Sequence, residues 1–151
     1  MNKKVTFEKV QEKLLKGVNT IANAVATSLG PKGRNVGIDK GFEQIILHDG
    51  VSIADSITLK NKEENFAAQI IKQAAKKQVD MVGDGTTVVC ILAQSIFSEC
   101  IKIISTGVNA MSLIKGLEEG CEKLVKELEK IAQPIKTLEQ KIQIATISAE
   151  D

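Results

Sequence analysis

Apolar residues recur at steps of three and four along most of the chain, a pattern that predicts amphipathic helices. The first such segment, residues 6–29, has an apolar stripe made of Val10, Leu14, Val18, Ile21, Ala22, Val25 and Leu29. Gly30 and Pro31 follow it and are expected to end the helix. Segments 62–82, 86–105 and 110–131 predict three more helices, and a short last one begins near Thr137.

A change of pattern between the first two helices predicts the only sheet. Residues 35–39 and 43–47 are short β-prone runs separated by Lys40, Gly41 and Phe42, which is typical of a hairpin. With 151 residues and 43% hydrophobic content the chain can form one core. The predicted fold is therefore mainly α and multihelical, with one small β-hairpin.

Three glycine-containing corners interrupt the helical pattern and carry the candidate chemistry. They are SLGPKGRN at residues 28–35 (the first corner), LHDGVS at 47–52 (the second) and VGDGTTV at 82–88 (the third). None is a Walker A loop, because G-x-x-x-x-G-K-[ST] requires a Lys-Ser/Thr pair at the head of a helix. A P-loop fold is therefore disfavoured.

The third corner opens an apolar run that carries no charge before Glu99. The first amides of a helix lack intrahelical partners and lie at its positive end, so a phosphate against Gly85, Thr86 and Thr87 could accept bonds from amides and hydroxyls. Asp84 would repel that phosphate unless a divalent cation lay between them. Because Mg²⁺ is typically held by one or two carboxylates plus phosphates, Asp84 is the candidate metal ligand.

Both acidic corners also have a purely structural interpretation. Gly83 could cap the preceding helix, and Asp84 or Thr86 the next one, with no ligand present. Taken alone, the second corner would be assigned as a type I′ or II′ turn, although Asp49 and Gly50 also precede a short helical pattern.

Taken together, the corners and the segment TISA at residues 146–149 resemble the group I chaperonins of bacteria and organelles. The resemblance extends over the whole chain. It implies that residues 1–133 are the N-terminal half of an ATP-binding equatorial domain. Residues 134–151 would be its last helix and the start of the intermediate, or hinge, domain. The apical domain of the family is absent from this sequence.

The resemblance also implies the role of individual residues. Asp84 matches the Mg²⁺ ligand, Thr86 and Thr87 match phosphate-binding hydroxyls, and Asp49 matches an acid that orients the attacking water. Residues 28–31 match a loop that packs against ATP or ADP and a monovalent cation, K⁺. The nucleotide-binding set that the resemblance implies is Ser28, Leu29, Gly30, Pro31, His48, Gly50, Gly83, Asp84, Gly85, Thr86, Thr87, Val88, Ile147 and Ser148.

Three positions depart from the family pattern. Val88 stands where a third Thr is usual, His48 where Lys is usual, and Glu150 where Asn is common. The loss of one hydroxyl contact to phosphate costs about 0.5–1.5 kcal/mol. These departures indicate a divergent paralogue.

The resemblance implies an ATP-dependent chaperone subunit that assists protein folding. In relatives the general base, and the apical surface that grips unfolded polypeptides and the co-chaperonin, lie downstream of the position of Asp151. We therefore expect weak nucleotide binding and little hydrolysis from these residues alone.

Relatives form stacked double rings, in which the N-terminal strand, here residues 3–6, pairs with a neighbour's hairpin. Two alternatives are a free-standing nucleotide-binding enzyme and a non-enzymatic short paralogue that docks into chaperonin rings.

The composition of the chain disfavours some classes of binding partner. The chain has 20 basic and 19 acidic residues, and a net charge of +1 implies neither nucleic acid nor an acidic membrane surface. Aromatic residues are only 3%, which leaves little for stacking on bases. Cys90, Cys100 and Cys121 lie on apolar helix faces and are expected to be buried free thiols in a reducing compartment. With no signal-peptide pattern at residues 1–6, the expected location is the cytoplasm. An exposed apolar patch and self-association are also expected.

Overall fold

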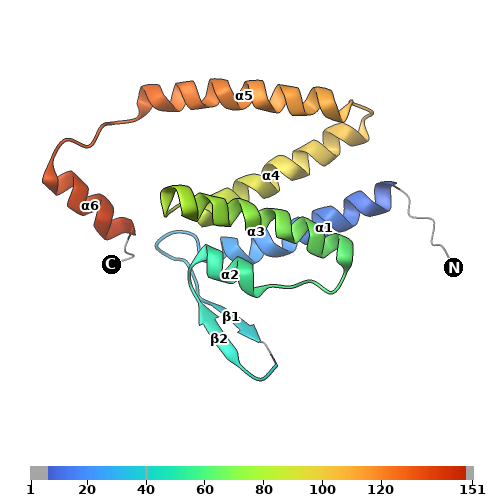
Figure 1. The fold of residues 1–151 in the computed structure, drawn as a ribbon, viewed down its shortest axis with the longest axis horizontal. Coiled ribbons are helices and arrows are strands. Elements are labelled where there is room, and N and C mark those ends of the chain that lie inside the picture. The colour runs from blue at the N-terminus through green and yellow to red at the C-terminus, as the bar shows by residue number, and fades with distance from the viewer. Residues whose placement is uncertain (1–6, 40, 149–151) are drawn as a thin grey trace. The chain divides into compact units, whose positions relative to one another are not determined.

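The computed structural model of the chain describes residues 7–39 and 41–148 (Figure 1). Within these residues the helices are α1 (Phe7–Ala26), α2 (Gly50–Ser56), α3 (Lys62–Val82), α4 (Thr86–Ser105), α5 (Ala110–Ile131) and α6 (Leu138–Ser148). The strands are β1 (Val36–Asp39) and β2 (Gln44–Leu47). The predicted mainly helical fold with one hairpin is confirmed for the described residues. The strand expected at residues 3–6 lies outside them.

The chain divides into two compact units, Met1–Lys102 and Ile103–Asp151, and the boundary falls in the last turn of α4. We call them the N-terminal and C-terminal units. The N-terminal unit contains α1, the hairpin, α2, α3 and most of α4, and therefore all three corners. The C-terminal unit contains α5 and α6.

The core of the N-terminal unit is formed where four helices meet. Its fully or almost fully buried side chains are Val18, Ile21, Ala22 and Val25 of α1, Ile53 and Ala54 of α2, Ala67, Ala68, Ile71 and Ala75 of α3, and Cys90 of α4. These positions repeat at steps of three and four on α1 and α3, as the periodicity predicts. The small residues of α3 allow its backbone to approach α1 closely.

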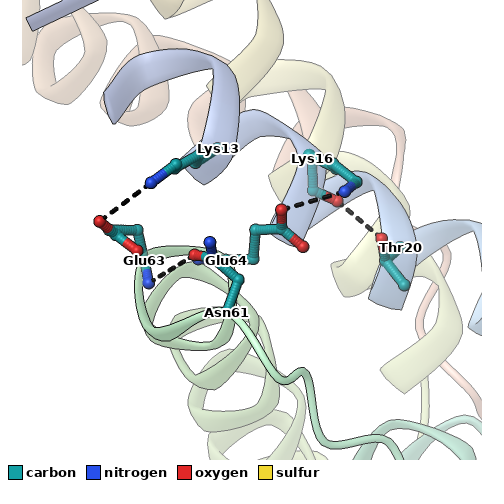
Figure 2. A network of polar contacts seen from close by, with 6 residues as sticks. All are labelled: Lys13, Lys16, Thr20, Asn61, Glu63 and Glu64. Carbon is teal, nitrogen blue, oxygen red and sulfur yellow. Dashed lines mark hydrogen bonds and ion pairs between the residues drawn. The ribbon is translucent and has the colours of Figure 1, made fainter. Parts of the chain in front are cut away.

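Charged pairs cross the interface between α1 and α3 at its edge. Lys13 Nζ lies 3.1 Å from Glu63 Oε1, and Lys16 Nζ lies 3.0 Å from Glu64 Oε1 (Figure 2). Asn61 caps α3 by accepting hydrogen bonds from the amides of Glu63 and Glu64. Because these side chains are accessible to water and salt, which screen their charges, the ion pairs add little to the stability that the buried core supplies.

The hairpin is antiparallel, with Val36 opposite Leu47 and Asp39 opposite Gln44. Val36 and Leu47 pack against the core, so the end of the hairpin next to the second corner is anchored there. At the other end Gly41 has a φ of 86° and donates its N–H to Asp39 Oδ1. The hairpin therefore connects the first corner to the second.

The first helix is shorter than the apolar pattern predicts: α1 ends at Ala26 instead of Leu29. The hydroxyl of Thr27 donates to the carbonyl of Ala24, and that of Ser28 donates to the carbonyl of Val25. Such local side-chain bonds compete with helical ones. Leu29 is consequently 49% exposed and does not continue the buried stripe.

Helix α4 is long and apolar enough to span a membrane by length and composition alone, with a mean hydropathy of 1.7. Core helices of soluble proteins have the same properties. In the N-terminal unit Cys90 is fully buried, Ala93 and Phe97 pack against the core, and Gln94 donates hydrogen bonds to α1. Only 6% of the apolar window of α4 is buried, however, and Leu92 and Ile96 are 54% and 50% exposed, so the helix packs on the unit along one face only.

The expectation of three buried thiols is wrong for two of them. Cys90 is buried, and burial raises the pKa of its thiol to about 11. Cys100 is half-buried and Cys121 is exposed. The error at Cys121 has a simple cause: none of the residues of α5, all of which the structure describes, is buried. Its stripe, which includes Met111, Ile114, Leu117, Leu124, Leu128 and Ile131, is the expected exposed apolar surface.

Candidate functional site

The third corner is shaped by two glycines with left-handed backbone. Gly83 (φ 81°) caps α3 and donates its N–H to the Val79 carbonyl at 2.9 Å, and Gly85 has a φ of 80°. Between them, the carbonyl of Asp84 accepts a 2.9 Å bond from Gln78 Nε2, and Asp84 Oδ1 accepts a 2.5 Å bond from the Gly85 amide. The C-cap at Gly83, which belongs to the purely structural interpretation of this corner, is therefore present. The exposed Asp84 carboxylate is thus held at the start of α4.

The amide groups at the start of α4 face no carbonyl of their own helix. Its first helical bond runs from the Val89 N–H to the Gly85 carbonyl, at 3.0 Å. The amides of Thr86, Thr87 and Val88 precede that bond and so lack intrahelical acceptors. This end of the helix also carries its partial positive charge. The arrangement suits an anion bound by amides and hydroxyls.

The second corner lies directly against the third. A Cβ added to Gly50 would lie 2.6 Å from Thr87 Oγ1, 3.0 Å from Thr86 Oγ1 and 3.2 Å from the Thr87 amide nitrogen. Contacts this short are far inside van der Waals distance, so any side chain at position 50 would displace its neighbours. Glycine therefore brings the N-terminus of α2 into contact with the N-terminus of α4.

Asp49 is the N-cap of α2, which corrects the assignment of the second corner to a hairpin-type turn. Its backbone is extended (φ −90°, ψ 144°), and Oδ1 accepts bonds from the amides of Val51 and Ser52, both at 3.0 Å. Burial by itself raises the pKa of Asp49, but hydrogen bonds from the Ser52 side chain and from the Ser52 and Val51 amides outweigh it. The pKa of Asp49 is consequently below its ordinary value, and the carboxylate stays ionised near neutral pH.

That lowered pKa predicts an acid-sensitive contribution of Asp49 to stability. Asn can also cap a helix but carries no charge, so Asp49→Asn isolates the ionic part. We expect the parent to be more stable than Asp49→Asn by roughly 0.5–1 kcal/mol above about pH 4, the ordinary Asp pKa. The difference should disappear as the pH falls through the lower folded-state pKa. Urea unfolding of both proteins at several pH values measures it, and a difference independent of pH would contradict the assignment.

The first corner reaches the third through a pair of hydroxyls. Ser28 Oγ lies 3.4 Å from Thr87 Oγ1, and because the Ser28 proton is donated to the Val25 carbonyl, Thr87 is the donor in this pair. The loop is folded tightly upon itself: the Gly33 amide donates to the Gly30 carbonyl at 2.8 Å, and a Cβ on Gly33 would lie 2.3 Å from the Ser28 carbonyl oxygen. Side chains larger than hydrogen are therefore excluded at position 33, and Ser28 is held facing α4.

The contacts between α1 and α4 show why these corners meet. Gln94 Nε2 donates to Asn19 Oδ1 at 2.8 Å and to Asn23 Oδ1 at 2.9 Å, while Ser28 meets Thr87 further along. Contacts advance along α1 as they retreat along α4, so the two helices run antiparallel. This antiparallel packing brings the end of α1 to the start of α4.

The structure brings some of the predicted nucleotide-binding residues into contact, and it does not place the others at the same point. Ser28 and Gly50 each contact Thr87, and Asp49 and Asp84 belong to the second and third corners, which this contact joins. Leu29, Gly30, Pro31, His48, Gly83 and Val88 lie on the exposed parts of the same corners. Ile147 and Ser148 belong to the last turn of α6 in the C-terminal unit, so their place in the site stays a prediction.

Two residues that the sequence did not single out support the corners. Gln78 orients the backbone of Asp84, and nothing distinguishes it in the sequence from other polar residues on a solvated helix face. Lys72 is buried and donates to the carbonyls of Asp55 and Ile57 at the end of α2. A signal for Lys72 did exist, since it interrupts an apolar helical stripe.

The donor groups at this site fit a phosphate with a hard divalent cation. Hydroxyls and amides are donors to phosphate, and the exposed Asp84 supplies a carboxylate beside them. No group of three or more His, Cys, Asp or Glu that could hold a metal occurs among the described residues. A cation here would therefore depend on phosphate and water for most of its ligands, which suits Mg²⁺ better than a metal that needs a complete protein cage.

Comparison with known families now identifies the chain. Residues 21–150 match the sequence model of the TCP-1/cpn60 chaperonin family, and the match includes all three corners and residues 146–149. Membership of this family implies chaperone-type function in protein folding and oligomeric assembly, and its members bind ATP with Mg²⁺. Because the match extends over far more than half of the sequence, the chain belongs to the TCP-1/cpn60 chaperonin family.

Proposed function

We propose that this chain is the N-terminal, nucleotide-binding portion of a group I chaperonin subunit. Residues 1–133 would form the N-terminal half of its equatorial domain, and residues 134–151 would lead into its hinge domain. The sequences of the three corners support group I. The free thiols of Cys90, Cys100 and Cys121 support a reducing compartment such as the cytoplasm.

The observation that carries the proposal is the convergence of the three corners on the start of α4. Ser28 of the first corner and Gly50 of the second both meet Thr87 of the third. In this arrangement the amides and hydroxyls of Thr86 and Thr87 would bind phosphate, and Asp84 would hold Mg²⁺. When bound, the cation would neutralise the repulsion between the phosphates and Asp84, so nucleotide and metal should bind cooperatively.

Binding with little turnover is the expected behaviour of this chain. Hydrolysis requires a water molecule oriented for attack on the terminal phosphate. The family resemblance assigns that task to Asp49, but its Oδ1 accepts two amide bonds as the cap of α2, and its lowered pKa makes it a weak base. We therefore propose that Asp49 orients water and that these residues alone release phosphate very slowly.

Replacement of Asp84 tests the proposal. We expect the parent to bind ADP weakly with Mg²⁺ and more weakly still without it. Asp84→Ala should weaken Mg-dependent binding by roughly tenfold or more, because the charge-assisted contact to the metal is lost. Isothermal titration calorimetry with ADP, with and without Mg²⁺ in a K⁺ buffer, measures both effects.

Asp80→Ala is the matched control, since it removes an exposed carboxylate from the last turn of the neighbouring helix α3. It should bind ADP like the parent. Val88→Thr should tighten binding, because it restores a hydroxyl at the start of α4. ADP affinity that is equal in Asp84→Ala and the parent would refute the site. Complete absence of nucleotide binding, together with co-migration of the chain with rings of a full-length chaperonin, would favour the non-enzymatic docking module.

A further inference from the structure

Lys72 is a buried lysine whose ammonium group ends at the C-terminus of α2. The residue is only 7% exposed, and its Nζ donates to the carbonyls of Asp55 at 3.1 Å and of Ile57 at 2.5 Å. Burial of an ammonium group is costly unless it is hydrogen-bonded. Here its partners are carbonyls of the last turn, which lack intrahelical donors and lie at the negative end of the helix dipole.

The pKa of Lys72 reflects this environment. Burial lowers it, and the negative charge of Asp55 acts in the opposite direction. A buried lysine contributes nothing to solubility. The exposed lysines of the same helix, such as Lys76 and Lys77, supply the solvated charge there. The buried ammonium therefore has a local task at the end of α2.

The other end of α2 lies at the candidate nucleotide site. The helix has 7 residues, so its ends are about 10 Å apart. Because Ile53 and Ala54 are fully buried and Asp49 caps the first turn, we expect this short helix to shift as one unit. A shift of its C-terminal end is consequently transmitted to Gly50, which has no free space against Thr87.

We propose that Lys72 is a positioning residue for the candidate nucleotide site. It fixes the C-terminus of α2 and thereby keeps Asp49 and Gly50 in register with Thr86 and Thr87, which it does not touch. The expected effect of Lys72 on nucleotide affinity rests on the proposed function. Its expected effect on the geometry of the second and third corners is independent of that function.

The test compares variants that differ in charge, donors and location. Lys72→Met keeps length and apolar volume but removes the charge and the donors, and Lys72→Arg keeps both. Lys76→Met removes an exposed lysine from the next turn of α3. Ile21→Val lowers stability from a core position on α1 and controls for a general loss of packing.

The first readout needs no nucleotide. Amide chemical shifts in ¹⁵N–¹H NMR spectra should change at residues 49–52 and 86–88 in Lys72→Met, and change much less in Lys72→Arg. Lys76→Met and Ile21→Val should leave both segments close to the parent. Equal changes in Ile21→Val, or none at residues 86–88 in Lys72→Met, would overturn the proposal.

The second readout is affinity for ADP with Mg²⁺. Lys72→Met should weaken it by roughly tenfold, the size typical of losing an outer-shell partner, and Lys72→Arg should recover most of the loss. If the parent binds no nucleotide, the proposed function fails while the amide shifts still decide the role of Lys72. If Lys72→Met does not fold, Lys72→Gln, which retains a donor on a shorter chain, must show the same shifts at residues 49–52 and 86–88, and their absence would refute the role.

Discussion

Gly17→Ala is expected to lower the free energy of unfolding of the N-terminal unit by roughly 1–3 kcal/mol, the usual cost of overpacking. A Cβ at position 17 would lie 2.1 Å from the carbonyl oxygen of Glu64 and 2.8 Å from its carbonyl carbon. These are backbone atoms of α3, so no rotamer change can relieve the overlap. Helix propensity alone predicts the opposite sign, because alanine in a helix interior is about 1 kcal/mol better than glycine.

Two control substitutions separate the clash from the loss of a glycine. Gly37 of β1 lies in the same unit, Gly116 lies in the middle of α5, and a Cβ at either position would meet nothing within 4 Å. Alanine at these positions should leave stability unchanged or raise it by about 0.4–1 kcal/mol. Urea unfolding followed by circular dichroism measures all three variants. A Gly17→Ala protein as stable as the Gly37→Ala protein would show that α1 and α3 are further apart than described here.

Local signals account for most of the fold that could be predicted from the sequence. The helices at residues 62–82, 86–105 and 110–131 have the expected bounds because their ends depend on nearby residues, such as the caps Asn61 and Asn109 and the left-handed Gly83. The end of α1 was misplaced because its apolar stripe continues to Leu29 while the hydroxyls of Thr27 and Ser28 already bond the preceding carbonyls. Periodicity does not report such competition.

The candidate site was only partly accessible from sequence. The second and third corners are marked by glycines and an acid, and the first by glycines alone, so their candidate role could be predicted from the sequence. The contact of Gly50 with Thr87 could not, because it depends on how α2 is seated on the core through Ile53 and Lys72. The exposure of Cys121 was missed for a related reason: an apolar stripe shows which face can be buried, not what covers it.

Gly50→Val is expected to abolish measurable binding of ADP with Mg²⁺. The contact at Gly50 involves the hydroxyls of Thr86 and Thr87 and an amide nitrogen at 3.2 Å. A branched side chain there must push α2 away from α4 or rotate the hydroxyls out of the position proposed for phosphate. The unfolding free energy should also fall by about 1–3 kcal/mol.

The double variant Gly50→Val/Thr87→Ala distinguishes a local clash from general damage. Removal of the Thr87 hydroxyl takes away the nearest atom, 2.6 Å from the added Cβ, so part of the lost stability should return, with a coupling of about 0.5–3 kcal/mol between the two positions. ADP binding should not return, because Thr87 itself is a proposed phosphate ligand. The matched control is Gly37→Val, at an exposed strand position where an added side chain meets open space. This variant should bind ADP like the parent. Urea unfolding and calorimetry of the parent, Gly50→Val, Thr87→Ala and the double variant complete the cycle. Strictly additive losses of stability would mean that positions 50 and 87 do not touch, and ADP binding by Gly50→Val at parental strength would remove the second corner from the site.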